Sequence, residues 1–361
     1  MRVLLCGGGT AGHVNPAIAI GETILRNSSN SKIAYVTTLN GIENSLVEFK
    51  KYPIDVSGFK GVFSFQNIKS VFKQFKAIER CKEIIREFRP DIIFGTGGYA
   101  TYPVVVAGHR LGVKTVLHES NVVPGRAVMK LEKIADRILV NFEESKNFFK
   151  NKEKVIRTGN PLRRGCDSYD KAQSRKELGI TQKYVILCTG GSLGAERINQ
   201  SAIEIIDNLV RCNSEVLFIW STGKREWEAS LGLSADRGLN KLNNVWMSDY
   251  FSNLPMLMSA ADIVISRAGA MTLSELASLK KASILVPSPN VANDHQRKNA
   301  EAIERAGGAI MILESKLYEI VDVVKELLDS PERQLDLEKN IARFSMSNAN
   351  RTIYNVLYNL L

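Results

Sequence analysis

The sequence predicts an α/β protein of two similar domains, each a parallel sheet covered by helices, and three observations carry this prediction. Short apolar or β-branched runs alternate with helical patterns along the whole chain. Glycine-rich turns directly follow such runs at residues 7–9, 95–98 and 190–194. The chain has 361 residues, which suits two domains of ordinary size.

The composition is that of a globular protein with an anionic partner. It is 44% hydrophobic and 24% charged, with a net charge of +10, which favours nucleic acid, an acidic membrane surface or a phosphorylated substrate. No apolar run approaches the roughly 20 residues that cross a bilayer. The chain enters a strand at once, so no signal peptide is expected. The five scattered cysteines lack a C-x-x-C pair and favour free thiols in a reducing compartment.

The first predicted unit is a strand at 2–6, a glycine turn, and a helix from about 15 to 25. This G-x-G-x-x-G has the strand–helix context of a dinucleotide site. A nicotinamide site would also need an acid after the next strand, 33–36, which ends in Thr37-Thr38-Leu39-Asn40 and disfavours an oxidoreductase. His13 is the best candidate for a general base, because its ordinary pKa is about 6.5. Alternatively, it only binds a phosphate or caps the helix.

Polar groups follow further strands of the first half. Strand 91–94 precedes a second glycine turn, Gly95 to Tyr99, and a helix from about 102 to 111. Strand 114–117 ends in His118-Glu119-Ser120-Asn121, at the edge where α/β proteins place ligand groups. Strands are also predicted at 137–140 and 155–157, and the polar, basic stretch 159–171 is the predicted domain boundary.

The segment from Phe59 to Lys76 is aromatic and basic, with no acidic residue. At 100° per residue, Ile68, Val71, Phe72 and Phe75 share one helix face, with lysines beside it. This pattern suits an anionic membrane surface. The alternative is a helix that packs on the core and exposes only its lysines. Residues 80–88 are predicted to form a charged helix.

The second half repeats the pattern. Strand 184–189 leads into the third glycine turn, residues 190–194, and strand 261–265 leads into the segment Ser266 to Glu275. Thr272 and Glu275 have a capping-box spacing, so a helix is predicted to begin at Thr272. Its amino end would bind a phosphate, and Glu275 would reach a ribose hydroxyl. The alternative is that Glu275 only caps the helix.

The remaining elements of this half are strands at 216–220, 245–247 and 284–286, a helix from about 294, and a terminal helix. Two such domains would face each other across a cleft that holds two phosphate-bearing ligands. No Asp-x-Asp or clustered His/Asp set is apparent, so a departing nucleotide diphosphate would be met by backbone N–H groups, helix dipoles and Arg163. Walker A and G-x-S-x-G sequences do not occur.

With these residues in place, the chain resembles the MurG family of bacterial N-acetylglucosamine transferases over nearly its whole length. The matching motifs are Gly8 to Pro16, Gly95 to Tyr99, His118 to Asn121, Gly159 to Arg163, Gly190 to Ala195 and Arg267 to Glu275. The resemblance implies the GT-B architecture, with two Rossmann-like domains at 1–160 and 161–344 and a terminal helix, about 345–361, that packs back on the first. It also implies an inverting, metal-independent reaction without a cofactor. The product would be lipid II, made from UDP-N-acetylglucosamine and undecaprenyl-pyrophosphoryl-N-acetylmuramyl-pentapeptide (lipid I).

The resemblance also implies site residues. Ser192 and the N–H groups near the start of the 270s helix would take the diphosphate, Glu275 the ribose and the backbone of Phe251 the uracil. The full set implied for UDP-N-acetylglucosamine is Thr10, Ala11, Gly12, Asn121, Arg163, Ser192, Phe251, Ala270, Met271, Thr272, Leu273, Ser274, Glu275 and Gln296. His13, helped by Glu119, would be catalytic, and Gly97, Gly98 and Tyr99 would bind the acceptor. The implied membrane residues are Phe63, Ile68, Lys69, Phe72, Lys73 and Phe75, on the cytoplasmic face of the cell membrane.

The chain departs from the family pattern at a few positions. Ala11 replaces a frequent glycine, Ala268 and Leu193 replace polar residues of some members, and His295 replaces a glutamine. The donor sugar is therefore less firmly implied than the nucleotide. A UDP-N-acetylglucosamine 2-epimerase shares the architecture and needs no lipid acceptor. A different class is a non-catalytic nucleotide-sugar or nucleic-acid binder. The basic charge allows nucleic acid, but no aromatic–basic stacking platform is apparent outside 59–76, so no nucleic-acid partner is expected.

Overall fold

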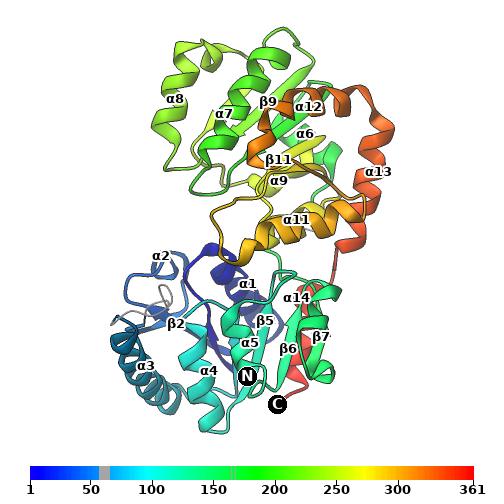
Figure 1. Cartoon of the computed structure of the whole chain (residues 1–361). Helices are drawn as coiled ribbons and strands as arrows, with labels where there is room; N and C mark the ends of the chain where they lie inside the picture. Colours follow the sequence, from blue (N-terminus) through cyan, green and yellow to red (C-terminus); the bar gives the residue numbers. More distant parts are fainter. Residues whose placement is uncertain (57–65, 164, 167) are drawn as a thin grey trace. The chain divides into compact units, whose positions relative to one another are not determined.

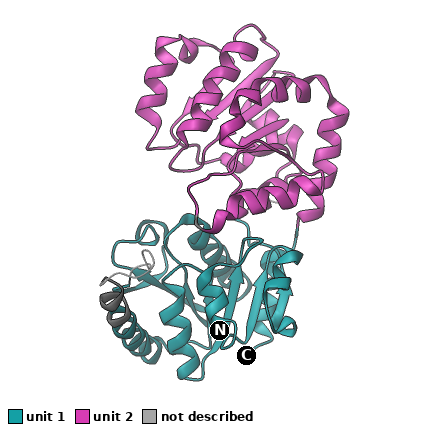
Figure 2. Ribbon diagram, in the orientation of Figure 1, with its two compact units in different colours: residues 1–164, 346–361 teal, residues 165–345 magenta. Residues whose placement is uncertain are grey.

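The chain folds into two compact units, in a computed structural model that describes all residues except 57–65, 164 and 167. Unit 1 contains residues 1–164 and 346–361, and unit 2 contains residues 165–345 (Figure 2). The sequence had placed the division after residue 160. The chain thus leaves unit 1 once, forms all of unit 2, and returns.

Unit 1 is built on a seven-stranded parallel sheet with the order β3-β2-β1-β4-β5-β6-β7. Its strands are β1 (Arg2–Cys6), β2 (Lys32–Thr38), β3 (Lys50–Ile54), β4 (Ile92–Gly95), β5 (Lys114–Glu119), β6 (Arg137–Val140) and β7 (Val155–Arg157). The order reverses between β1 and β4. The carboxyl ends of these two strands therefore flank a topological switch point, where ligands bind in open α/β sheets.

Helices cover both faces of this sheet (Figure 1). They are α1 (Ala11–Asn27), α2 (Glu43–Leu46), α3 (Gln66–Phe88), α4 (Thr101–Arg110), α5 (Arg126–Leu131), the 3-10 turns η1 (Glu143–Phe148) and η2 (Lys152–Lys154), and α14 (Ala349–Tyr358). One core cluster contains α3, α4 and α5, and another contains α1 and α14. The sheet is thus buried on both sides, which explains its nearly continuous apolar strands.

The terminal helix α14 is attached to unit 1 by Asn350. Its side-chain Nδ2 donates to the carbonyl of Leu162 at 2.9 Å, and its Oδ1 accepts the N–H of Leu162 at 2.9 Å. Nδ2 also donates to Oγ1 of Thr23 on α1 at 3.1 Å. The amide therefore joins the point where the chain leaves unit 1 to the helix by which it returns.

Unit 2 is a six-stranded parallel sheet with the order β10-β9-β8-β11-β12-β13. Its strands are β8 (Tyr184–Thr189), β9 (Val216–Ser221), β10 (Val245–Ser248), β11 (Ile263–Ser266), β12 (Ala282–Leu285) and β13 (Ile310–Met311). Its helices are α6 (Lys171–Leu178), α7 (Glu196–Ile205), α8 (Trp227–Asp236), α9 (Leu254–Ala260), α10 (Ala270–Ser278), α11 (His295–Arg305), α12 (Ile320–Asp329) and α13 (Pro331–Ile341). Shorter turns are η3 (Ile206–Val210), η4 (Leu239–Lys241), η5 (Ala292–Asp294), η6 (Glu314–Glu319) and η7 (Ala342–Phe344). The switch point here lies between β8 and β11.

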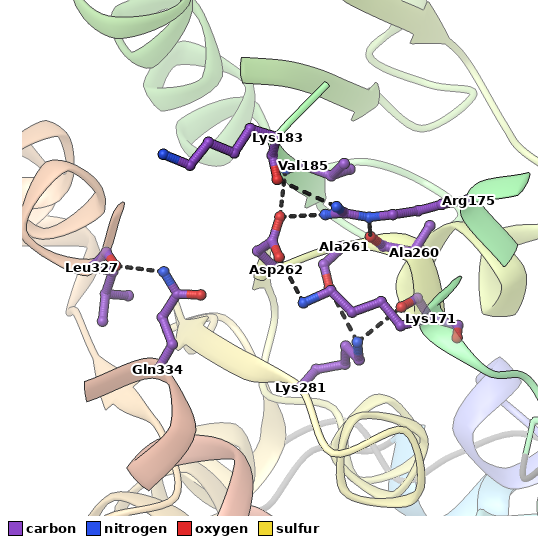
Figure 3. A network of polar contacts seen from close by, with 11 residues as sticks. Lys171, Arg175, Lys183, Val185, Ala260, Ala261, Asp262, Lys281, Leu327 and Gln334 are labelled. Carbon is purple, nitrogen blue, oxygen red and sulfur yellow. Dashed lines mark hydrogen bonds and ion pairs between the residues drawn. The ribbon is translucent and has the colours of Figure 1, made fainter. Parts of the chain in front are cut away.

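A charged network closes the opposite, amino-terminal edge of this sheet (Figure 3). The buried carboxylate of Asp262 pairs with Lys171 at 2.6 Å and Arg175 at 2.5 Å, and accepts the N–H of Val185. Lys281, which is also buried, donates from Nζ to the carbonyl oxygens of Ser259 (2.8 Å) and Ala261 (3.1 Å). The network fixes α6 and α9 to the starts of β8, β11 and β12.

The structure corrects several expected element boundaries. Helix α10 begins at Ala270, two residues before the predicted start at Thr272, because the N–H of Leu273 already donates to the carbonyl of Gly269. The helices expected at 68–76 and 80–88 form the single helix α3. Strands β3 and β13 were not expected. No helix in the described part of the chain combines the length and apolarity that crossing a membrane requires.

Candidate functional site

The first and second glycine turns, residues 7–9 and 95–98, touch at the switch point of unit 1. A Cβ on Gly98 would lie 2.0 Å from the carbonyl oxygen of Gly8, so a side chain at this position would collide with the backbone. Gly97 and Gly98 also have positive φ values of 94° and 76°, which glycine adopts readily. These two turns therefore need their glycines to pack together.

His13 stands between the two turns. It is the third residue of α1, and its Nδ1 lies 2.9 Å from the carbonyl oxygen of Thr96. A carbonyl only accepts, so Nδ1 carries the proton in this hydrogen bond, and in the neutral imidazole Nε2 then keeps a lone pair. The side chain is half-buried. Neutral His13 thus has the tautomer that a general base needs, with Nε2 as the basic atom.

The amino end of α1 lies beside His13. Thr10 is its N-cap residue, and Thr10 and Gly12 are exposed while Ala11 is half-buried. The first N–H groups of a helix have no partner within it and carry the positive end of the helix dipole. This end of a 17-residue helix is suited to an anion such as a phosphate.

The segment after β5 is organised by buried polar groups. Burial lowers the pKa of His118 to about 4, and its Nε2 lies 3.1 Å from the carbonyl of Gly159, so the imidazole is neutral. Glu119 accepts the backbone N–H (2.9 Å) and Nδ2 (3.1 Å) of Asn121, and the N–H of Gly125 (2.7 Å). These contacts give Glu119 the role of shaping the loop that presents Asn121.

Glu43 is a buried group of this site that the sequence reasoning missed. Its Oε1 accepts hydrogen bonds from the backbone N–H (2.9 Å) and the Oγ1 hydroxyl (2.6 Å) of Thr38. A Cβ added to Gly8 would lie 3.2 Å from the same oxygen. Its Oε2 has no hydrogen-bond partner among the described residues. The carboxyl group therefore packs against the first glycine turn at Gly8. The only sequence signal was a glutamate just after the polar end of a strand.

In unit 2, the third glycine turn (residues 190–194) and the amino end of α10 lie at neighbouring strand ends. β8, which precedes the turn, pairs in register with β11, which precedes α10. Ser192 is exposed, and Ala270 is the first residue of α10, after the N-cap residue Gly269. The switch point of unit 2 thus combines a glycine turn with a helix amino end, as the sequence predicted for a phosphate site.

The residues of α10 differ in what they can offer a ligand. Met271 and Thr272 are half-buried in the first turn. Leu273 is 1% exposed and its N–H is bonded within the helix, while Oγ of Ser274 donates to the carbonyl of Ala270 at 3.1 Å. Glu275 is one turn further in and 7% exposed. The first turn is therefore the part of α10 best placed for a ligand, and Leu273 is a core residue.

Three further predicted residues are Phe251 and Gln296 in unit 2 and Arg163 in unit 1. Phe251 follows β10 and is half-buried. Gln296 is the second residue of α11, and its Oε1 accepts the N–H of Ser288 at 2.9 Å, which fixes the side-chain amide. Arg163 is exposed at the end of the first segment of unit 1.

Helix α3, Gln66–Phe88, contains the predicted membrane residues other than Phe63. Phe75 is 59% exposed, whereas Ala77, Ile78 and Cys81 are buried in the core of unit 1. Lys76 is exposed, and Lys73 pairs with Asp55 at 3.0 Å. The side chains of residues 57–72, and with them Phe63, Ile68, Lys69 and Phe72, lie outside the described residues. The buried face of α3 is therefore not the face that carries Phe75.

In the described part of the chain, no group of three or more His, Cys, Asp or Glu side chains is arranged to hold a metal ion.

The family models and the curated relatives agree on one family. The glycosyltransferase family 28 N-terminal domain matches residues 3–140, and the C-terminal domain of the same family matches residues 185–353. Two curated relatives are named UDP-N-acetylglucosamine–N-acetylmuramyl-(pentapeptide) pyrophosphoryl-undecaprenol N-acetylglucosamine transferase. The one from Thermoanaerobacter sp. (strain X514) is 39% identical over 99% of both chains. The one from Acetivibrio thermocellus is 35% identical over 100% of this chain and 98% of its own.

Solved structures show the same fold at lower identity. MurG of Acinetobacter baumannii superposes with a TM-score of 0.77 at 24% identity, covering 99% of both chains. The UDP-GlcNAc 2-epimerase of Neisseria meningitidis, solved with UDP-GlcNAc bound, has a TM-score of 0.67 at 20% identity. The match covers 99% of this chain and 100% of the epimerase chain. Because both identities are low, these likenesses establish the architecture only.

Proposed function

The chain belongs to the MurG family of glycosyltransferase family 28, and from this membership we propose how it performs N-acetylglucosamine transfer. It is a UDP-N-acetylglucosamine-dependent hexosyltransferase with two Rossmann-like domains. It transfers N-acetylglucosamine to the C4 hydroxyl of undecaprenyl-pyrophosphoryl-N-acetylmuramyl-pentapeptide, the step of peptidoglycan synthesis that makes lipid II from lipid I. Relatives at 35–39% identity over nearly the full length carry this activity in their names.

The proposed donor residues are mainly those at the switch point of unit 2. Ser192 and the first-turn N–H groups of α10 at Ala270, Met271 and Thr272 bind the diphosphate, and the carboxylate of Glu275 accepts from a ribose hydroxyl. The backbone of Phe251 binds the uracil, and Gln296 binds sugar hydroxyls. The support is that the glycine turn and the helix amino end follow two paired strands. The dipoles they carry favour a departing anion.

The proposed acceptor residues are those at the switch point of unit 1. The amino end of α1 and the turn Gly97–Tyr99 bind the acceptor diphosphate, and Asn121 with Thr10 to Gly12 faces the donor sugar. Nε2 of His13 takes the proton of the acceptor C4 hydroxyl while the hydroxyl oxygen attacks the anomeric carbon of the donor sugar. The bond from that carbon to UDP breaks with its electron pair going to UDP, and the configuration inverts. The hydrogen bond from Nδ1 to Thr96 is the observation that carries the role of His13.

Membrane association is proposed for α3. Phe75 is a large apolar side chain exposed on a helix whose core face is occupied by other residues. Lys73 and Lys76 flank it, as in segments that bind anionic lipid surfaces. Phe63, Ile68, Lys69 and Phe72 are the other members of the proposed face. The enzyme is thereby proposed to be peripheral on the cytoplasmic side of the cell membrane, where its lipid-linked acceptor lies.

A transfer assay with radiolabelled UDP-N-acetylglucosamine, with and without the lipid-linked acceptor, tests the function. Label should enter the lipid phase, and UDP should be released, only when the acceptor is present. Conversion of the donor without acceptor would instead identify a 2-epimerase, which shares the fold. If the protein bound the UDP-sugar but neither released UDP nor converted the donor, it would be a non-catalytic nucleotide-sugar binder.

A further inference from the structure

The third glycine turn is in direct contact with the turn that follows β9, residues 222–225. A Cβ on Gly223 would lie 2.0 Å from the backbone N of Gly194, and a Cβ on Gly194 would lie 2.2 Å from the carbonyl oxygen of Thr222. Both glycines have positive φ values, 84° and 89°. The two turns are therefore packed backbone against backbone.

Two hydrogen bonds fix the register of this contact. The N–H of Lys224 donates to the carbonyl oxygen of Ser192 at 3.2 Å, and the N–H of Arg225 donates to that of Leu193 at 3.3 Å. Ser192 is the residue proposed to bind the donor diphosphate. Two cationic residues are thus held by their backbones next to a proposed phosphate site.

The side chains of the two residues are engaged differently. Nε of Arg225 pairs with the carboxylate of Glu226 at 2.9 Å, and its side chain is 69% exposed. Nζ of Lys224 lies 5.7 Å from the ring centroid of Tyr250, the residue before Phe251. In the part of the chain that the structure describes, no carboxylate pairs with Lys224. Its charge therefore remains available to an anion, close to the residue proposed to bind uracil.

We propose that Lys224 is a further donor-binding residue, whose ammonium group contacts the diphosphate of UDP. This rests on the proposed function and extends the donor site to the turn after β9. As the sugar–phosphate bond breaks, the electron pair stays on UDP, and a nearby ammonium stabilises that charge. The flexible four-carbon stem of lysine allows Nζ to move from the ring of Tyr250 to a phosphate oxygen.

Calorimetric titration of the full-length protein with UDP and with uridine tests this proposal. Lys224→Ala should weaken UDP binding about tenfold, the low end for a hydrogen bond to a charged group, and leave uridine binding unchanged. Arg225→Ala is the matched control, because it removes the same charge from the same turn, and it should change UDP binding less than twofold. Lys224→Arg should restore most of the affinity.

Each other outcome overturns the proposal. Equal losses in Lys224→Ala and Arg225→Ala would reduce the effect to net charge, and equal losses for UDP and uridine would place Lys224 at the base or ring. An unchanged UDP affinity in Lys224→Ala would show that the ammonium makes no phosphate contact. Failure of the unsubstituted protein to bind UDP would instead contradict the proposed function itself.

Discussion

The imidazole of His13 and the backbone carbonyl of Thr96 form a 2.9 Å hydrogen bond that joins α1 to the second glycine turn of unit 1. The hydroxyl of Thr96 in turn donates to the carbonyl oxygen of His13. The ring orientation and tautomer of His13 are thus set by the backbone of the adjacent turn, before any substrate is present.

Replacing His13 by Ala should stop transfer but spare the donor. We expect kcat to fall about 100-fold or more, the usual contribution of a general base, because the acceptor hydroxyl loses its proton acceptor. The dissociation constant for UDP, measured by calorimetry, should change less than twofold. His109→Ala, which removes an exposed histidine at the end of α4, is the matched control. Loss of donor affinity in His13→Ala would show that the two units do not divide the substrates in this way.

Replacing Glu275 by Ala should have the opposite effect. The carboxylate is 7% exposed, and its loss should weaken UDP binding by roughly ten- to a hundredfold through the missing charged hydrogen bond to ribose. Glu275→Gln should lie between, because an amide oxygen still accepts. Glu228→Ala, on an exposed part of α8, should bind UDP normally. If 2′,3′-dideoxy-UDP loses as much affinity in Glu275→Ala as UDP does, the ribose assignment is wrong.

The pH dependence of stability should reveal Lys281. Burial, with the charge of Lys171, lowers the pKa of Lys281 to about 8, although Glu338 and Asp262 oppose this shift. Between pH 8 and the ordinary lysine pKa near 10.4 the unfolded chain binds a proton that the folded chain lacks, so this group makes the free energy of unfolding rise with pH. The contribution of Lys281 to this rise in the free energy of unfolding should be about 3 kcal/mol at most, at about 1.4 kcal/mol per pKa unit.

The measurement must compare variants, because buried thiols act in the other direction. The raised pKa values of Cys6 (about 12) and Cys188 make stability fall above the ordinary thiol pKa. Urea unfolding from pH 7.5 to 10.5 should show a smaller rise, or a steeper fall, in Lys281→Met than in the unsubstituted protein. Lys325→Met, an exposed lysine on α12, should match the unsubstituted profile. Identical profiles for both variants would refute the lowered pKa.

Thiol reactivity should single out Cys212. It is the exposed cysteine, whereas Cys6, Cys81, Cys166 and Cys188 are buried. Burial also raises the pKa of Cys81 and Cys188, which keeps them protonated and unreactive. A chromogenic disulfide reagent should therefore titrate one thiol rapidly in the native protein and five in denaturant, and Cys212→Ser should remove the rapid phase. Two or more rapid native thiols would contradict the packing of these cysteines.

Serine substitutions at Phe63 and on α3 should weaken membrane binding. Replacing Phe63, Phe72 and Phe75 together should lower co-sedimentation with anionic vesicles, and the residual binding should be more salt-sensitive because only lysines remain. Phe148→Ser, which changes an exposed phenylalanine of η1, is the control. Circular dichroism should show an unchanged fold. Vesicle binding equal to that of the unsubstituted protein would assign these aromatics another role.

The features that the sequence predicted are the local ones. A strand followed by glycines and a helix, as at Arg2 to Gly12, is encoded within a dozen residues, and both sheets and most turns follow from such stretches. Spacing also placed Ser192 beside a strand end. The start of α10 was mispredicted because the cap at Gly269 won over the capping-box spacing at Thr272.

Features that depend on distant contacts stayed outside the reach of the sequence. The tautomer of His13 is set by Thr96, and Glu43 is buried against Gly8, so each needs the packing of separate segments. Lys224 acquires its importance only because β9 lies next to β8, which brings its turn to Ser192. The hydrogen bonds of Glu119 to Asn121 and Gly125 likewise could not be predicted from the pair His118-Glu119, which the sequence shows only as two ionisable residues.

The two hydrogen bonds between the side-chain amide of Asn350 and the backbone of Leu162 make unit 2 replaceable as one piece. Residues 165–345 are one uninterrupted stretch, and Leu162 and Asn350, which lie just outside its two ends, are hydrogen-bonded to each other. A chimeric gene could therefore replace that stretch with the equivalent part of another family 28 enzyme while keeping both ends of unit 1. Nucleotide-sugar preference would travel with the insert, and acceptor preference would stay with the host.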